Sequence, residues 1–135
     1  MMPPRPRRYL REAAAMLVLA RVAVRLVPAA RLFAWAGQPP RRIKRFAASE
    51  IAWIAWAVET LSGRSWMRGH ELARALAAQA MLRRRGIASR LCLGVARDGA
   101  RLAAQAWVER RGKVVVGTPD AARVTRLAEF GAEPA

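Results

Sequence analysis

Few side chains in this sequence can act as nucleophiles, acid–base groups or metal ligands. The chain contains one cysteine, Cys92, and one histidine, His70. Because a metal centre built on these ligands needs three or four of them, no metal site is predicted. The sequence also contains no phosphate-binding loop, dinucleotide fingerprint or nucleophile elbow. We therefore expect neither a metal nor a cofactor.

The adjacent residues His70 and Glu71 stand at the predicted start of a helix and are the nearest approach to an acid–base pair. An acid in the first helical turn is stabilised by the helix dipole, so Glu71 has a structural explanation; it can also bind a cationic group of a peptide or partner. His70 is expected either at the rim of a peptide-binding cleft or as a solvated cap. Cys92 lies among small residues in a predicted strand, which favours a buried, unreactive thiol.

Apolar residues recur at helical spacing through the first two thirds of the chain. They predict helices over residues 9–27, from Pro28 through Trp35, over 41–61 and over 71–84. The Gly37-Gln38-Pro39-Pro40 break separates an N-terminal helical element, residues 1–40, from a main body, residues 41–135. The basic run Arg83-Arg84-Arg85 suits the negative end of the last helix, and Gly86 suits its cap.

After Gly86 the apolar period changes to two, which predicts strands. Leu91, Leu93 and Val95 define the first strand, and Asp98-Gly99 predicts a hairpin turn into a second strand over 102–108. Arg111-Gly112 turns the chain into a third strand over 114–116. A last short helix or turn is expected from Thr118 to near Phe130. The predicted fold class is α+β, with a helix packed on a small antiparallel sheet.

The formal net charge is +16, and arginine supplies almost all of it. Such a charge attracts nucleic acid, anionic membranes or acidic peptides, or it reflects compositional drift alone. The basic residues are spread along the chain, which disfavours a dedicated nucleic-acid arm. The longest uncharged run near the N-terminus, residues 13–20, is too short to span a bilayer. We expect a cytoplasmic protein without a transmembrane segment.

Residues 71–117 resemble the transglutaminase-like cysteine peptidases that remove leader peptides during lasso-peptide biosynthesis. The matching segments are residues 72–79, 82–87, 93–95 and 104–109, together with Gly112, and more loosely residues 25–28. The resemblance implies a transglutaminase- or papain-like core. It also implies a Cys-His-Asp triad: a nucleophile at the helix start, an imidazole on the second strand and an acid after the third.

At the three triad positions this chain carries Glu71, Gln105 and Gly117, with an uncertainty of one residue that would move the first to His70. Asp120 is the nearest carboxylate to the acid position. A carboxylate is a poor acyl-transfer nucleophile, and an amide cannot shuttle a proton. We expect Gln105 to fill the imidazole space and to pair with Glu71 or a nearby backbone group.

Trp107 is expected on the face of Gln105, either as the floor of a peptide cleft or as a seal between helix and sheet. The resemblance implies a precursor or leader peptide as ligand, and a separate leader-recognition protein and a cyclase as partners. The leading hypothesis is a catalytically inactive homologue that binds the precursor or a partner. The alternatives are an active or altered peptidase that uses His70 and Glu71, and a small basic protein that binds nucleic acid or a membrane surface.

Overall fold

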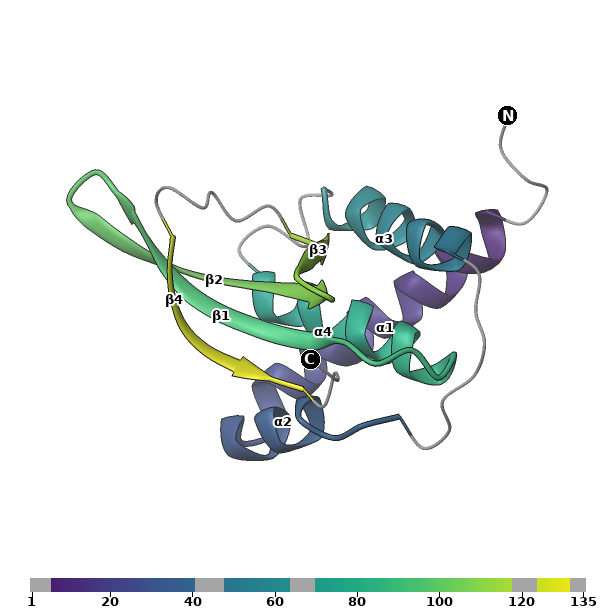
Figure 1. Cartoon of the computed structure of the whole chain (residues 1–135), viewed down its shortest axis with the longest axis horizontal. Coiled ribbons are helices and arrows are strands. Elements are labelled where there is room, and N and C mark those ends of the chain that lie inside the picture. Colours follow the sequence, from purple (N-terminus) through teal and green to yellow (C-terminus); the bar gives the residue numbers. More distant parts are fainter. Residues whose placement is uncertain (1–5, 41–47, 64–69, 118–123, 132–135) are drawn as a thin grey trace.

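The computed structural model describes residues 6–40, 48–63, 70–117 and 124–131, which form four helices followed by four strands (Figure 1). The helices are α1 (Pro6–Leu26), α2 (Ala29–Ala36), α3 (Ala48–Ser62) and α4 (Glu71–Arg84). The strands are β1 (Arg90–Asp98), β2 (Arg101–Arg110), β3 (Lys113–Val116) and β4 (Val124–Phe130). The predicted α+β class is confirmed. The expected start of the third helix, residues 41–47, lies outside the described residues.

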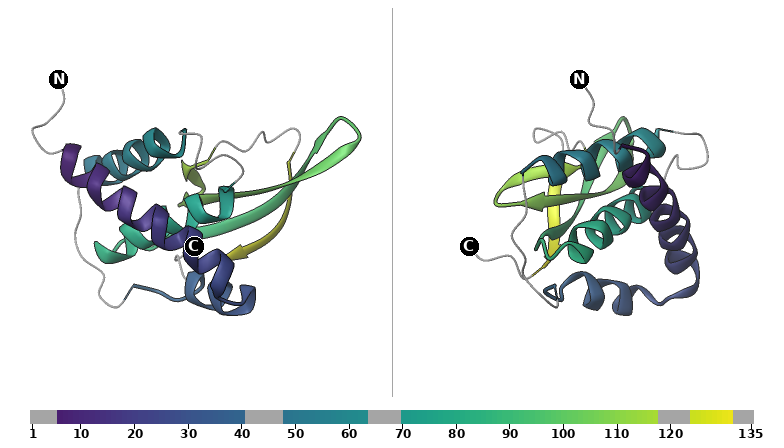
Figure 2. Two further views of the ribbon diagram at one scale, coloured as in Figure 1. Left: turned by 180° about the vertical axis from the view of Figure 1, so that it is seen from behind. Right: turned by 90° about the vertical axis from the view of Figure 1, so that its right-hand side faces the viewer.

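The strands form one antiparallel sheet in the order β3-β2-β1-β4. The turns predicted at residues 98–99 and 111–112 are confirmed, and the β1–β2 hairpin extends well beyond the helices (Figures 1 and 2). The short helix predicted near the C-terminus was wrong, because Val124–Phe130 is a strand paired with β1. This fourth strand occupies an edge of β1 that a three-stranded meander would leave without partners.

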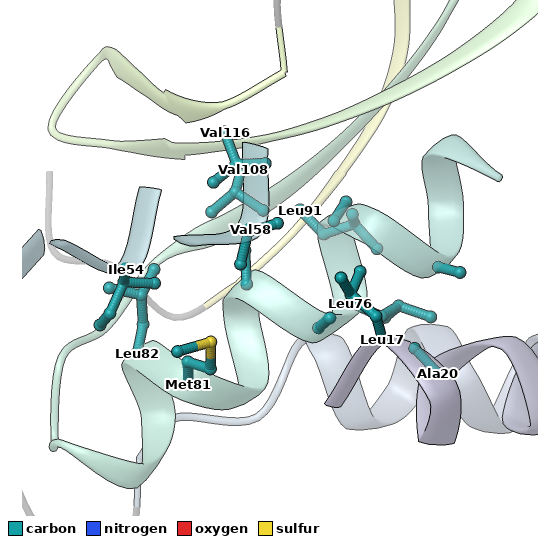
Figure 3. Close-up of a cluster of buried hydrophobic side chains, with 14 of the residues drawn as sticks. Leu17, Ala20, Ile54, Val58, Leu76, Met81, Leu82, Leu91, Val108 and Val116 are labelled. Carbon is teal, nitrogen blue, oxygen red and sulfur yellow. The ribbon is translucent and has the colours of Figure 1, made fainter. Parts of the chain in front are cut away.

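The hydrophobic core lies between the helices and one face of the sheet, with α4 between α1 and the strands (Figure 2). Small alanines along α4 allow this close packing on both sides. Figure 3 shows part of this cluster, and its labelled residues include members of α1, α3, α4 and the first three strands: Leu17, Ile54, Val58, Leu76, Met81, Leu82, Leu91, Val108 and Val116. The aromatic ring of Phe130 on β4 stacks on that of Phe33 on α2, at 4.7 Å between centroids, so the last strand is also held by the second helix.

The basic run at the end of α4 has specific partners, which the dipole explanation did not include. The Arg85 guanidinium donates to both carboxylate oxygens of Glu12 on α1, at 2.6 and 2.7 Å. Arg83 donates to the carbonyl oxygens of Trp35 and Gln38, each at 2.7 Å. These contacts fix the C-terminal end of α4 to α1 and to the end of α2.

Candidate functional site

The N-terminus of α4 meets β2 at the position where the triad nucleophile was expected. The Glu71 carboxylate accepts a hydrogen bond from the backbone N–H of Ala106, at 3.4 Å, near the long limit for such a bond. Its oxygens therefore face the edge of β2. His70 precedes the helix as its N-cap residue and makes no side-chain capping bond.

The acid position, Gly117, lies against the same segment of β2. A Cβ atom added there would lie 2.6 Å from the Trp107 Cβ and 3.4 Å from the Ala106 carbonyl oxygen. The φ angle of Gly117 is 99°, which strains any residue with a side chain. Its backbone N–H donates to the Glu59 carboxylate of α3, at 2.9 Å. Glu71 and Gly117 thus both lie against the Ala106–Trp107 segment of β2, and Glu59 is bonded to Gly117.

Gln105, the imidazole position, points to the other face of the sheet. In the β1–β2 register Gln105 lies opposite Gly94 and Trp107 opposite Cys92, whereas Ala106 and Val108 face the helices. The expected side-chain contact between Gln105 and Glu71 is not made in the described part of the chain. The alternation of side chains along a strand is the reason, since Glu71 contacts the backbone of the next residue.

Trp107 is the centre of a polar cluster on the face of the sheet away from the helices. Its indole Nε1–H donates to the Glu109 carboxylate at 2.7 Å, and the Arg126 guanidinium on β4 donates to the same oxygen at 2.6 Å. Arg126 also lies 5.7 Å from the centroid of the Trp107 ring. Trp107 is only 3% exposed, and it seals this outer face rather than the boundary between helices and sheet.

Cys92 belongs to this outer face as well. Its side chain is fully buried, and its sulfur lies 3.9 Å from the Arg126 guanidinium. Burial raises the pKa of the thiol to about 12, and the nearby Glu109 carboxylate adds to the rise. The thiol is therefore protonated at neutral pH, and it lies across the sheet from the N-terminus of α4.

His70 lies beside α1. It borders a hollow of about 500 Å³, and the other described residues that line this hollow belong to α1 and include Val18, Val22 and Arg25. Its side chain and that of Glu71 therefore have different surroundings, although the two residues are adjacent in the chain. Asp120 lies outside the described residues. Among the described residues, no three side chains of His, Cys, Asp or Glu gather closely enough to hold a metal ion.

The chemistry available at the three triad positions is hydrogen bonding by carboxylates and backbone groups. Glu71 and Glu59 accept from β2 and from the residue after β3, and Gly117 offers no side chain. Glu59 was missed by the sequence analysis because its position on an apolar helix gave no sign that it faces the sheet. Its place at the acid position is set by tertiary packing of α3 against β3.

In this fold the N-terminus of a central helix, α4, meets the second strand of an antiparallel sheet. A family model described as the transglutaminase-like superfamily matches residues 14–129. No curated protein and no solved structure matches the chain. In the described residues, no helix combines the length and apolar character that crossing a bilayer requires. Because the match extends from α1 to β4 and includes every element around the triad positions, this chain belongs to the transglutaminase-like superfamily.

Proposed function

We propose that this chain is a catalytically inactive relative of the lasso-peptide leader peptidases, which binds a precursor peptide or a partner without hydrolysing it. It would act in the cytoplasm beside a separate leader-recognition protein and a cyclase. The superfamily match supports the scaffold, and the resemblance of residues 71–117 supports the narrower assignment.

The location of the only cysteine carries this proposal. A transglutaminase-like peptidase needs a thiolate at the N-terminus of the central helix, where the dipole and free N–H groups stabilise it. Here that position holds Glu71, which bonds to β2, while Cys92 is buried on the other face of the sheet with its pKa raised to about 12. Replacing the thiolate by a carboxylate leaves the N-terminus of α4 without the thiol group that forms the acyl-enzyme in a cysteine peptidase.

The alternative of an altered peptidase would use His70 and Glu71 as an acid–base pair. Their surroundings oppose it: His70 borders the hollow beside α1, whereas Glu71 faces the edge of β2. A general base must lie within hydrogen-bond reach of the group that it deprotonates. The side chains of His70 and Glu71 face different parts of the molecule and do not meet this condition.

The test is a cleavage and binding assay with the precursor peptide encoded beside the gene. The purified protein is incubated with the labelled precursor, with and without the neighbouring leader-recognition protein. Mass spectrometry follows cleavage, and fluorescence anisotropy follows binding. We expect binding without cleavage, and the same result for Cys92→Ala, which removes the only thiol. Cleavage by the unmodified protein would overturn the proposal, and the absence of any binding would remove the proposed role.

A matched variant tests the geometric reason. Glu71→Cys combined with Gln105→His restores two of the three triad residue types. We expect this double variant to remain inactive, because residue 105 lies on the sheet face of Trp107 while residue 71 contacts the backbone edge of β2. Alkylation by iodoacetamide checks that the new cysteine is accessible. Cleavage that depends on both substitutions would show that position 105 reaches the helix N-terminus.

A further inference from the structure

The outward face of α1 carries large apolar side chains that are exposed in the described part of the chain. Val18, Leu19, Val22 and Leu26 are 52%, 61%, 47% and 77% exposed, and together we call them the α1 ridge. Three of them, Val18, Val22 and Leu26, repeat every fourth residue, so they form one continuous stripe along the helix. Single exposed apolar residues are ordinary, but a contiguous stripe of four is typical of an interaction site.

The α1 ridge separates two hollows. One, of about 330 Å³, lies between α1, α2 and α4 and is lined almost wholly by apolar side chains, with Leu19 on its ridge side. The other, of about 500 Å³, borders Val18 and Val22 and reaches His70. A ridge flanked by two hollows suits a partner whose own apolar side chains project into them, as in the docking of one amphipathic helix against others. A flat bilayer surface would leave both hollows unfilled.

The charge around the α1 ridge has one sign. Arg31 borders the first hollow and Arg25 the second, and both are exposed. The only acidic residue in α1 and α2 is Glu12, whose side chain is 12% exposed and paired with Arg85. A second copy of this chain would bring the same arginines together, which like-charge repulsion opposes. Charge complementarity therefore selects an acidic partner.

We infer that the α1 ridge and its two hollows are a docking surface for an acidic amphipathic helix, a peptide segment with one apolar stripe flanked by carboxylates. Its apolar side chains would enter the two hollows on either side of the ridge, and its carboxylates would pair with Arg25 and Arg31. This inference does not depend on the proposed role in peptide maturation, because the docking surface includes none of Glu71, Gln105 and Gly117.

The experiment uses two synthetic probes of identical composition and charge. Each is a fluorescein-labelled peptide of about 18 residues, or five helical turns, rich in Glu. In one peptide the leucines form a single helical stripe, and in the other they are scrambled around the helix. Fluorescence anisotropy of the full chain at about 150 mM salt suppresses long-range attraction between charges. We expect the striped peptide to bind at least about tenfold more tightly.

Two pairs of variants locate the binding surface. Leu19→Asp acts on the α1 ridge, and its control Leu102→Asp acts on the distant β1–β2 hairpin, where Leu102 is 70% exposed. Arg31→Glu acts at the rim, and its control Arg97→Glu changes an exposed arginine of the same hairpin. We expect each surface variant to weaken binding of the striped peptide by about tenfold and each control to leave it within about twofold. Thermal melting of all four proteins checks that they fold.

Three results would overturn the inference. Equal affinity for the striped and scrambled peptides would reduce the interaction to net charge. Equal losses in the hairpin controls would show that the α1 ridge is not the site. The same variants are also tested by cosedimentation with vesicles of phosphatidylglycerol and phosphatidylcholine. Vesicle binding that is lost in Leu19→Asp, combined with no preference for the striped peptide, would assign this face to a membrane surface instead.

Discussion

Gly117 offers the sharpest test of the geometry at the triad positions, through substitution by alanine. Two independent costs arise from one methyl group. The φ angle of 99° costs a residue with a side chain about 1–3 kcal/mol. The new Cβ would lie 2.6 Å from the Trp107 Cβ, and relieving such overlap in a packed region costs about 1–3 kcal/mol more. We expect Gly117→Ala to lower the free energy of unfolding by about 4 kcal/mol.

Gly112→Ala is the matched control. Gly112 also has a positive φ angle, 77°, but a Cβ there would have no neighbour within 4 Å. This substitution therefore carries the backbone cost alone, about 1 kcal/mol. The difference between the two variants, about 3 kcal/mol, combines the contact between residue 117 and Trp107, about 2 kcal/mol, with the larger backbone cost at the φ angle of 99°.

Urea unfolding followed by tryptophan fluorescence measures both variants. With a slope of about 2 kcal/mol per molar urea, the expected loss in Gly117→Ala moves the midpoint down by about 2 M, and the loss in Gly112→Ala by about 0.5 M. Equal shifts in the two variants would refute the reasoning, because they would show that the segment after β3 does not press against Trp107.

Two further predictions concern groups outside the triad positions. Burial opposes the ionisation of Glu12, but its hydrogen bonds and attraction to Arg85 outweigh burial and lower the pKa of the carboxyl. The pair therefore stabilises the fold at pH values above the ordinary carboxyl pKa. This contribution is lost as the pH falls through the lowered pKa. Glu12→Gln should lower the free energy of unfolding at pH 7 by about 3 kcal/mol and make stability depend less on pH in the acid range. The control Glu129→Gln changes a side chain that is 35% exposed and should cost under about 1 kcal/mol. Equal costs in urea unfolding would contradict the stabilising role of the Glu12–Arg85 pair. Cys92, with its pKa raised to about 12, should resist iodoacetamide in the folded protein from pH 7 to pH 9 and react once the chain is unfolded in urea. Rapid modification of the folded protein would contradict the burial of this thiol.

The elements that the sequence predicted well are those whose periodicity is undisturbed. The alternation from Leu91 onward and the two turns gave the β1–β2–β3 meander, because half-buried strands require a period of two and turns require particular residues. The strand β4 could not be predicted in this way. Its residues alternate weakly in polarity, and its structure depends on pairing with the free edge of β1 and on the stacking of Phe130 on Phe33. Both contacts join segments far apart in the chain.

The resemblance indicated which residues to expect at the candidate site but not the directions of their side chains. The resemblance located Glu71, Gln105 and Gly117, but side-chain direction depends on which strand face each residue occupies. Gln105 was expected to pair with Glu71 or with a nearby backbone group, and in the structure the backbone N–H of the next residue, Ala106, bonds to Glu71. Glu59 could not be predicted as part of the site, because nothing in the sequence around a glutamate on an apolar helix indicates that it will bond to the Gly117 N–H.

The contacts around Gly117 determine whether an acid could be introduced at the expected acid position. An aspartate at position 117 would need the same backbone angle and the same space beside Trp107 that exclude alanine. That space is also fixed from the other side, because Glu59 holds the Gly117 N–H, and Trp107 is held in turn by Glu109. A working acid at position 117 would require that residue to move, which would break its bond to Glu59. On the proposed function, an acid at position 117 is therefore opposed by the packing of α3 and β2, whereas a nucleophile at position 71 would require only one different side chain at the start of α4.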